Sequence, residues 1–169
     1  MDTGTDLLDL LLAQHGALAD LFASHQEALL DRRWTEAARL LKDYDRGLRG
    51  HIGLEEEHLL PHCEHSHGMR WPANVYRAEH RRIEQLLHKA AERLAIARCR
   101  GITPAVLILL LDEERSLKHL LEHHHEREEK GLFGELRATL SGVACSALVT
   151  GSTASELHRA TRGRSARGP

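Results

Sequence analysis

Cysteine, aromatic residues and long apolar runs are all scarce in this chain of 169 residues. The cysteines, Cys63, Cys99 and Cys145, are odd in number and lack paired spacing, which argues against a disulfide framework. Only 4% of the residues are aromatic, and β-branched residues are few beside Leu, Ala, Glu and Arg, which favours helices over sheet. The longest apolar run, around residues 105–111, is too short to cross a membrane.

An excess of charge of one sign is also missing. The formal net charge of -2 provides no basic field, so the sequence does not indicate a nucleic-acid partner. The first residues, MDTGTDLLDLLL, carry no basic residue before their Leu run, which is not typical of a signal peptide. We therefore expect a cytoplasmic protein without a membrane partner.

The chain divides by composition into residues 1–140 and 141–169. The second part is rich in Ser, Thr, Gly, Ala and Arg, which predicts a mostly disordered, Arg-containing tail. In the first part, apolar residues at helical spacing predict four helices, over about residues 5–30, 35–60, 72–97 and 104–140. Pro61 is expected to end the second helix because proline lacks a backbone N–H. Short connections predict an all-α, antiparallel up-down-up-down four-helix bundle over residues 1–140.

Histidine, by contrast, is abundant, with 14 residues. His51 is followed four places on by Glu55, and His124 by Glu128, so each pair lies on one face of its helix. One such pair is weak evidence, because a solvated contact at this spacing is common. The set is more specific, since one His lies on the apolar stripe of each predicted helix: His15, His51, His80 and His124.

Burying these imidazoles and two carboxylates would cost several kcal/mol per group without compensation, and a bound cation removes that cost. Two metal ions bridged by the two carboxylates would each receive two imidazoles and a share of both Glu. Nitrogen and oxygen ligands without thiolate suit Fe, Mn or Zn. The alternative is a polar bundle core that holds no metal.

The order of these residues resembles the hemerythrin-like, or HHE cation-binding, domain family over about residues 5–137. The resembling pattern is His15 … His51-x-x-x-Glu55 … His80 … His124-x-x-x-Glu128, with Glu56 and Glu129 after the two Glu and with Glu79 before His80. The resemblance implies a four-helix bundle that holds two non-haem iron ions with an oxo or hydroxo bridge. It implies one iron on the His of the first two helices, the other on the His of the last two, and Glu55 and Glu128 as bridges.

The sequence departs from the oxygen-carrying members of that family. They have a further His one turn from the third-helix His, where this chain has Tyr76 and Glu84. Three roles are open for Tyr76: a metal ligand through its phenolate, a hydrogen-bond donor to a metal ligand, or a core aromatic residue. Two are open for Glu84: a solvated acid, or a hydrogen-bond partner of a metal ligand. The last carboxylate is also a Glu at i+4, whereas the carriers use an Asp at i+5. These differences leave an open coordination position.

The resemblance thus implies binding of, or reaction with, oxygen, nitric oxide or peroxide rather than oxygen transport. Whether such a reaction is enzymatic stays open, and the alternative is an iron-sensing, iron-storage or iron-delivery module without turnover. No redox or protein partner is indicated.

Residues around the six are expected to support them. A metal-binding imidazole usually donates its second N–H to a carboxylate or carbonyl, and Glu56, Glu79 and Glu129 are candidates. Tyr44, two turns before His51, is either a core residue or a hydroxyl near the open site. His125 is expected to face outward or to support the ligands.

Overall fold

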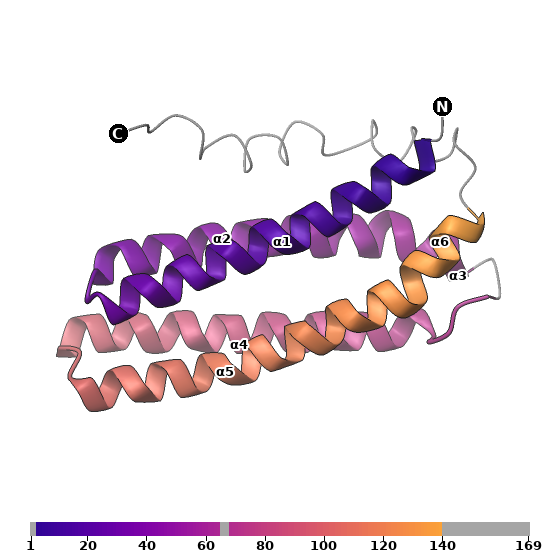
Figure 1. Cartoon of the computed structure of the whole chain (residues 1–169). Helices are drawn as coiled ribbons and strands as arrows, with labels where there is room; N and C mark the ends of the chain where they lie inside the picture. Colours follow the sequence, from indigo (N-terminus) through magenta and orange to yellow (C-terminus); the bar gives the residue numbers. More distant parts are fainter. Residues whose placement is uncertain (1–2, 65–67, 140–169) are drawn as a thin grey trace, which may run out of the picture.

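The computed structural model describes residues 3–64 and 68–139, and all its regular elements in these ranges are helices (Figure 1). In chain order they are α1 (Thr3–Leu30), α2 (Trp34–Leu54), the π-helix η1 (Glu55–Leu59), α3 (Leu60–Glu64), α4 (Ala73–Arg100), α5 (Pro104–Arg127), the π-helix η2 (Glu128–Leu132) and α6 (Phe133–Thr139). The predicted tail, residues 141–169, lies outside the described residues. Within the described ranges, no helix combines the length and the apolar character that crossing a membrane requires.

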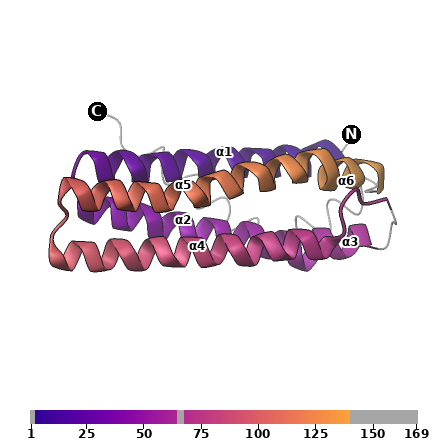
Figure 2. The same cartoon turned by 90° about the horizontal axis from the view of Figure 1, so that it is seen from below.

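The long helices form an antiparallel bundle, which confirms the predicted fold class. α1 packs against α2 and α4 against α5, and these two pairs meet through α2 with α4 and α1 with α5. The α1–α2 and α4–α5 turns lie at one end of the bundle, and α3 and α6 lie at the other (Figures 1 and 2). Local sequence signals shape the α4–α5 turn. Gly101 ends α4 at a φ of 94°, and the Thr103 hydroxyl accepts a hydrogen bond of 3.3 Å from the Val106 N–H.

The prediction that the second helix stops at Pro61 is wrong. The chain stays helical to Glu64, because the π turn η1 resets the hydrogen-bond register just before the proline: the Leu60 N–H donates to the Glu55 carbonyl, five residues back. Pro61 then falls in the first turn of α3, where its missing N–H is tolerated. The fourth predicted helix is interrupted in the same way by η2.

Two buried apolar clusters fill the described bundle, one on each side of a polar layer. The larger cluster lies toward the two turns and includes Leu18, Leu48, Ile83 and Leu121. The smaller lies toward α3 and α6 and includes Leu11, Leu54, Tyr76 and Leu132. On each long helix the predicted metal-binding residues fall between members of these clusters, so the apolar stripes that form the bundle also bury the polar layer.

Candidate metal centre

Each long helix places one imidazole in the polar layer. His15 comes from α1, His51 from α2, His80 from α4 and His124 from α5, and none is more than 7% exposed. The Nε2 atoms face each other in pairs, at 2.9 Å between His15 and His51 and at 3.1 Å between His80 and His124. At these distances the lone pairs of two Nε2 atoms repel each other unless a proton or a cation lies between them.

The carboxylates of Glu55 and Glu128 join the two imidazole pairs. Each is the first residue of a π turn and is fully buried. The Glu55 oxygens lie 3.0 Å from His51 Nε2 and 3.1 Å from His80 Nε2. The Glu128 oxygens lie 2.7 Å from His124 Nε2 and 3.2 Å from His15 Nε2. Each carboxylate thus spans both halves of the chain.

The structure brings all six predicted metal-binding residues together. They form two overlapping groups, each with its ligand atoms within 4.8 Å of one another: His15, His51, Glu55 and Glu128, and Glu55, His80, His124 and Glu128.

The donor atoms fit a bound cation better than a network of hydrogen bonds. The four oxygens of Glu55 and Glu128 lie near imidazole nitrogens, yet among the described residues none has a hydrogen-bond partner of acceptable geometry. Burying carboxylate oxygens without hydrogen-bond partners lowers the free energy of unfolding. Nitrogen and oxygen atoms that converge on common points, without thiolate, suit a first-row divalent metal.

The electrostatics of the layer also favour positive charge. Burial lowers the pKa of His80, but Glu128, Glu55 and Glu56 outweigh burial and raise that pKa to about 10. The pKa of His124 is raised to about 9, because Glu128 again outweighs burial. Burial raises the pKa of Glu128, but His124 and its neighbours hold it well below the ordinary value. The metal-free centre therefore retains protons that a metal ion must displace.

Two of the expected supporting carboxylates lie at the outer nitrogens of the imidazoles. His80 Nδ1–H donates to Glu56 at 2.8 Å, and His124 Nδ1–H donates to Glu79 at 3.1 Å. Arg127 Nε–H donates to the other Glu79 oxygen at 2.9 Å. Burial raises the pKa of Glu79, but His124 and Arg127 outweigh burial and lower it.

Three other candidates lie away from the ligand atoms. Glu129 is exposed, unlike the six clustered residues, and its support of an imidazole stays a prediction. Glu84 pairs at 3.0 Å with Arg49 on the outside of the bundle. Tyr44 belongs to the larger apolar cluster, where its ring lies 5.0 Å from that of Phe22, and burial raises its pKa.

Tyr76 lies beside the turn that carries Glu128. Its side chain is 1% exposed, and its hydroxyl is 3.5 Å from the Arg127 carbonyl. A Cβ added to Gly131 would meet that hydroxyl at 2.7 Å, so the absent side chain makes room for the phenol. Burial, with a further contribution from Glu128, raises the pKa of Tyr76.

Two further residues contact imidazoles of the site, and of these only Gln14 had no sequence prediction. The Gln14 side-chain carbonyl accepts a hydrogen bond of 2.8 Å from His51 Nδ1–H. The His125 ring stacks on His15, at 3.9 Å between ring centres and 10° between planes. His125 was expected only to face outward or to support the ligands, and no signal marked Gln14 except its place before His15. Burial, followed by the charge of His15, lowers the pKa of His125 to about 3.

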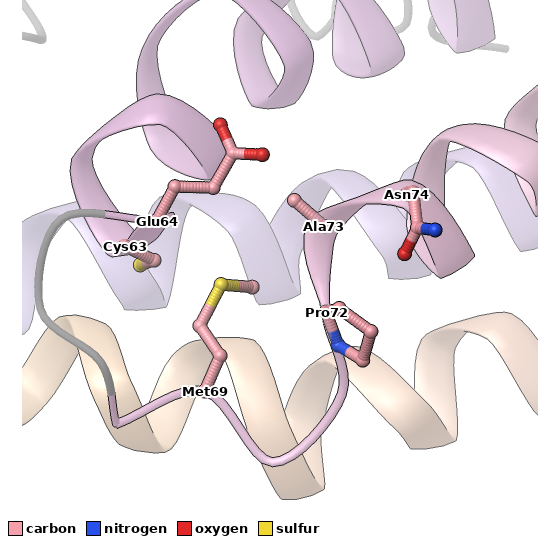
Figure 3. A pocket seen from close by; sticks show the side chains of 6 residues that line it. All are labelled: Cys63, Glu64, Met69, Pro72, Ala73 and Asn74. Atoms are coloured by element: carbon pink, nitrogen blue, oxygen red, sulfur yellow. The ribbon is translucent and has the colours of Figure 1, made fainter.

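A pocket lies away from the centre, between α3 and the start of α4. Figure 3 shows the Met69 side chain reaching between the turn with Cys63 and Glu64 and the residues Pro72, Ala73 and Asn74. None of the six clustered residues lines it. Burial, with a contribution from Glu135, raises the pKa of Cys63 to about 12, so this thiol is not a ready thiolate ligand.

Comparison with known families agrees with this geometry. A family model described as the Hemerythrin HHE cation binding domain matches residues 6–136. Comparisons with curated proteins and with solved structures gave no match. The family match covers most of the chain, including every residue of the two clustered groups. The chain therefore belongs to the hemerythrin HHE cation-binding domain family.

Proposed function

We propose that the polar layer holds two iron ions with an oxo or hydroxo bridge. His15 and His51 would hold one ion, His80 and His124 the other, and Glu55 and Glu128 would bridge them. The observation that carries this proposal is the pair of buried carboxylates, each spanning both imidazole pairs without a hydrogen-bond partner among the described residues. The same donor set also suits Mn or Zn.

The bound iron pair would supply redox chemistry toward oxygen, nitric oxide or peroxide, and we propose that the protein binds or reacts with such small ligands. Each group offers four protein ligand atoms, which leaves room in an iron coordination sphere for an added ligand. The six ligand residues are at most 7% exposed, so the surrounding protein would admit only small molecules and restrict water.

Metal analysis after anaerobic reconstitution with Fe²⁺ tests the centre. We expect iron to be retained, together with a near-ultraviolet band of the oxo-bridged oxidised pair. His124→Ala should lose iron, whereas His88→Ala should keep it, because His88 is an exposed helical His that also precedes a Glu by four residues. An iron-free protein, or equal iron in both variants, would contradict the proposal.

Stopped-flow mixing of the reduced protein with oxygen, nitric oxide and peroxide tests the reactivity. We expect a rapid change in the iron spectrum with at least one of them, at unchanged iron content. A centre that is inert to all three and only releases iron would favour a role in iron sensing, storage or delivery.

A further inference from the structure

The four imidazoles of the centre differ in the hydrogen-bond partners of their Nδ1 atoms, the ring nitrogens that do not face the candidate metal positions. His80 and His124 each donate Nδ1–H to a carboxylate, Glu56 at 2.8 Å and Glu79 at 3.1 Å. His51 donates to the neutral amide of Gln14 at 2.8 Å. The buried Nδ1 of His15 has no hydrogen-bond partner among the described residues.

His15 is oriented by ring stacking instead. Its ring centre lies 3.9 Å from that of His125 and 5.8 Å from that of Phe133, with 22° between the planes of His15 and Phe133. Stacking fixes the plane of an imidazole but accepts no proton from it. The neighbouring Gln14 amide nitrogen is also buried without a partner among the described residues, so this side of the centre offers no anionic acceptor.

An anionic acceptor at the outer nitrogen raises the basicity of a metal-binding imidazole and fixes its tautomer. Losing such a partner typically costs about 10- to 100-fold in metal affinity. On the α4–α5 side both imidazoles have carboxylate acceptors, and Arg127 holds Glu79 in place. On the α1–α2 side, His51 has an amide acceptor, and His15 has no acceptor within residues 3–64 and 68–139.

We propose that the two metal positions are unequal. The His80–His124 position binds its ion first and tightly, and the His15–His51 position fills second and exchanges its ion readily. Gln14 and His125 are positioning residues that set the weaker position. This inference rests on the proposed two-metal centre, and it implies that the protein carries one ion when the metal is limiting.

Stepwise anaerobic titration of the metal-free protein with Co²⁺, in competition with a chromophoric chelator, measures both dissociation constants. We expect two steps that differ by about tenfold or more. Glu79→Gln should weaken the tighter step. Gln14→Glu, which gives His51 a carboxylate acceptor, should tighten the weaker step by about tenfold. Gln85→Glu is the charge-matched control, because Gln85 is exposed on α4, and it should leave both steps unchanged.

The His125 variants test the stacking contact. His125→Phe keeps an aromatic ring against His15 and should leave the weaker step unchanged, whereas His125→Ala should weaken it further. Circular dichroism establishes that each variant is folded, and the two steps of the unmodified protein test the proposal without any variant.

The outcomes separate the inference from the function on which it rests. Two equal steps, or a Gln14→Glu variant that tightens only the first step, would overturn the unequal positions and leave a two-metal centre intact. Binding of no ion, or of a single ion at saturation, would overturn both.

Discussion

Both tyrosines of the chain are buried, but only Tyr76 lies beside the metal centre. Tyr44 packs in the larger apolar cluster, whereas the Tyr76 hydroxyl faces the Arg127 carbonyl and the space beside Gly131. Burial raises the pKa of Tyr76, which favours the neutral phenol. We therefore expect Tyr76 to be an outer hydrogen-bond donor rather than a phenolate ligand.

Tyr76→Phe tests this role. Since the hydrogen bond that it removes is long, we expect a loss of about 1 kcal/mol or less in the free energy of unfolding. Iron content and the visible spectrum should stay as in the unmodified protein. Loss of a strong visible band in the variant would show instead that the Tyr76 oxygen binds iron.

The pKa shifts of the metal-free centre predict how its stability depends on pH. The pKa of His80 is about 10 in the fold against an ordinary value of 6.5, and that of His124 is about 9. Their contribution to stability is complete below pH 6.5 and is lost as the pH rises through about 9 to 10. The low pKa of Glu128 adds stability above pH 4.5 that is lost on further acidification.

Urea unfolding of the metal-free protein across this range measures the effect. We expect the free energy of unfolding to be greatest near pH 6.5. It should fall above that pH because the unfolded chain releases the protons that His80 and His124 keep in the fold, and below it because His125, whose pKa is lowered to about 3, binds a proton only in the unfolded chain. A free energy of unfolding that rises steadily from pH 6.5 to 10 would contradict the raised pKa values of His80 and His124.

Periodicity along single helices was enough to predict which six residues gather, because each lies on its own apolar stripe. Adjacency to these residues also identified Glu56 and Glu79. Gln14 precedes His15 as Glu79 precedes His80, but it was not predicted because its side chain is a neutral amide and not a carboxylate. For all of these neighbours the sequence left open which imidazole each contacts: Gln14 contacts His51, and His125 contacts His15. Such contacts depend on the axial register between helices, which periodicity leaves undetermined.

Among the helical elements, the two π turns occupy equivalent places in the two halves. Each begins at a candidate bridging residue, Glu55 or Glu128. The two His-x-x-x-Glu turns of the sequence thus also share a backbone geometry. The π turns themselves could not be predicted, because a π turn differs from an α turn by one hydrogen-bond register and has no composition signal as clear as that of a cap or a proline.

Gly131 within η2 provides a test of this element. Its added Cβ would meet Trp71 and the Tyr76 hydroxyl at 2.7 Å, so Gly131→Ala should destabilise the fold by about 1 to 3 kcal/mol. Gly134→Ala is the matched control, because no atom lies within 4 Å of its added Cβ, and helix propensity favours the change by up to about 1 kcal/mol. Denaturant unfolding of both variants measures the difference, and equal stabilities would contradict the close packing at η2.

A buried pair, His25 and Glu114, also joins α1 to α5 nearer the turn end of the bundle, and no sequence pattern indicated it. His25 Nε2 lies 2.9 Å from Glu114, and His25 Nδ1–H donates to the Ala37 carbonyl at 2.7 Å. Gln26 donates to the other Glu114 oxygen at 3.1 Å. Both members of the pair are at most 2% exposed, so removing one leaves the other buried without its partner.

Glu114→Ala should therefore cost about 3 to 5 kcal/mol in the free energy of unfolding. Iron content should be unchanged, because His25 lies roughly 15 Å along α1 from His15. Glu122→Ala, at an exposed position of α5, should stay within about 0.5 kcal/mol of the unmodified protein. Loss of iron from the folded Glu114→Ala protein would show that the pair supports the centre.

For the molecule as a whole, the centre joins its two halves. Glu55 belongs to the first half but lies against His80, and Glu128 belongs to the second half but lies against His15. A metal ion bound by both carboxylates would therefore link α1 and α2 to α4 and α5. The bundle was predictable from helical spacing and turn signals, and the two bridging carboxylates were predicted from their place on the apolar stripes. Which imidazole of the other half each carboxylate contacts required the three-dimensional structure.

Removing the metal should accordingly lower the melting temperature. At a free iron concentration about 1,000-fold above its Kd, binding to the folded state alone adds about 4 kcal/mol to the free energy of unfolding. For a chain of this length that corresponds to a fall of roughly 10 °C in Tm. Calorimetry with and without a chelator measures the shift, which should vanish in His124→Ala and persist in His88→Ala. A chelator without effect on the unmodified protein would contradict a structural contribution of the metal.

The most direct measurement is anomalous diffraction at the iron edge from crystals of the iron-reconstituted protein. We predict two peaks per chain, one at the Nε2 atoms of His15 and His51 and one at those of His80 and His124. Oxygens of Glu55 and Glu128 should lie within coordination distance of both peaks. A single peak, no peak, or iron bound elsewhere on the chain would contradict the two-metal centre.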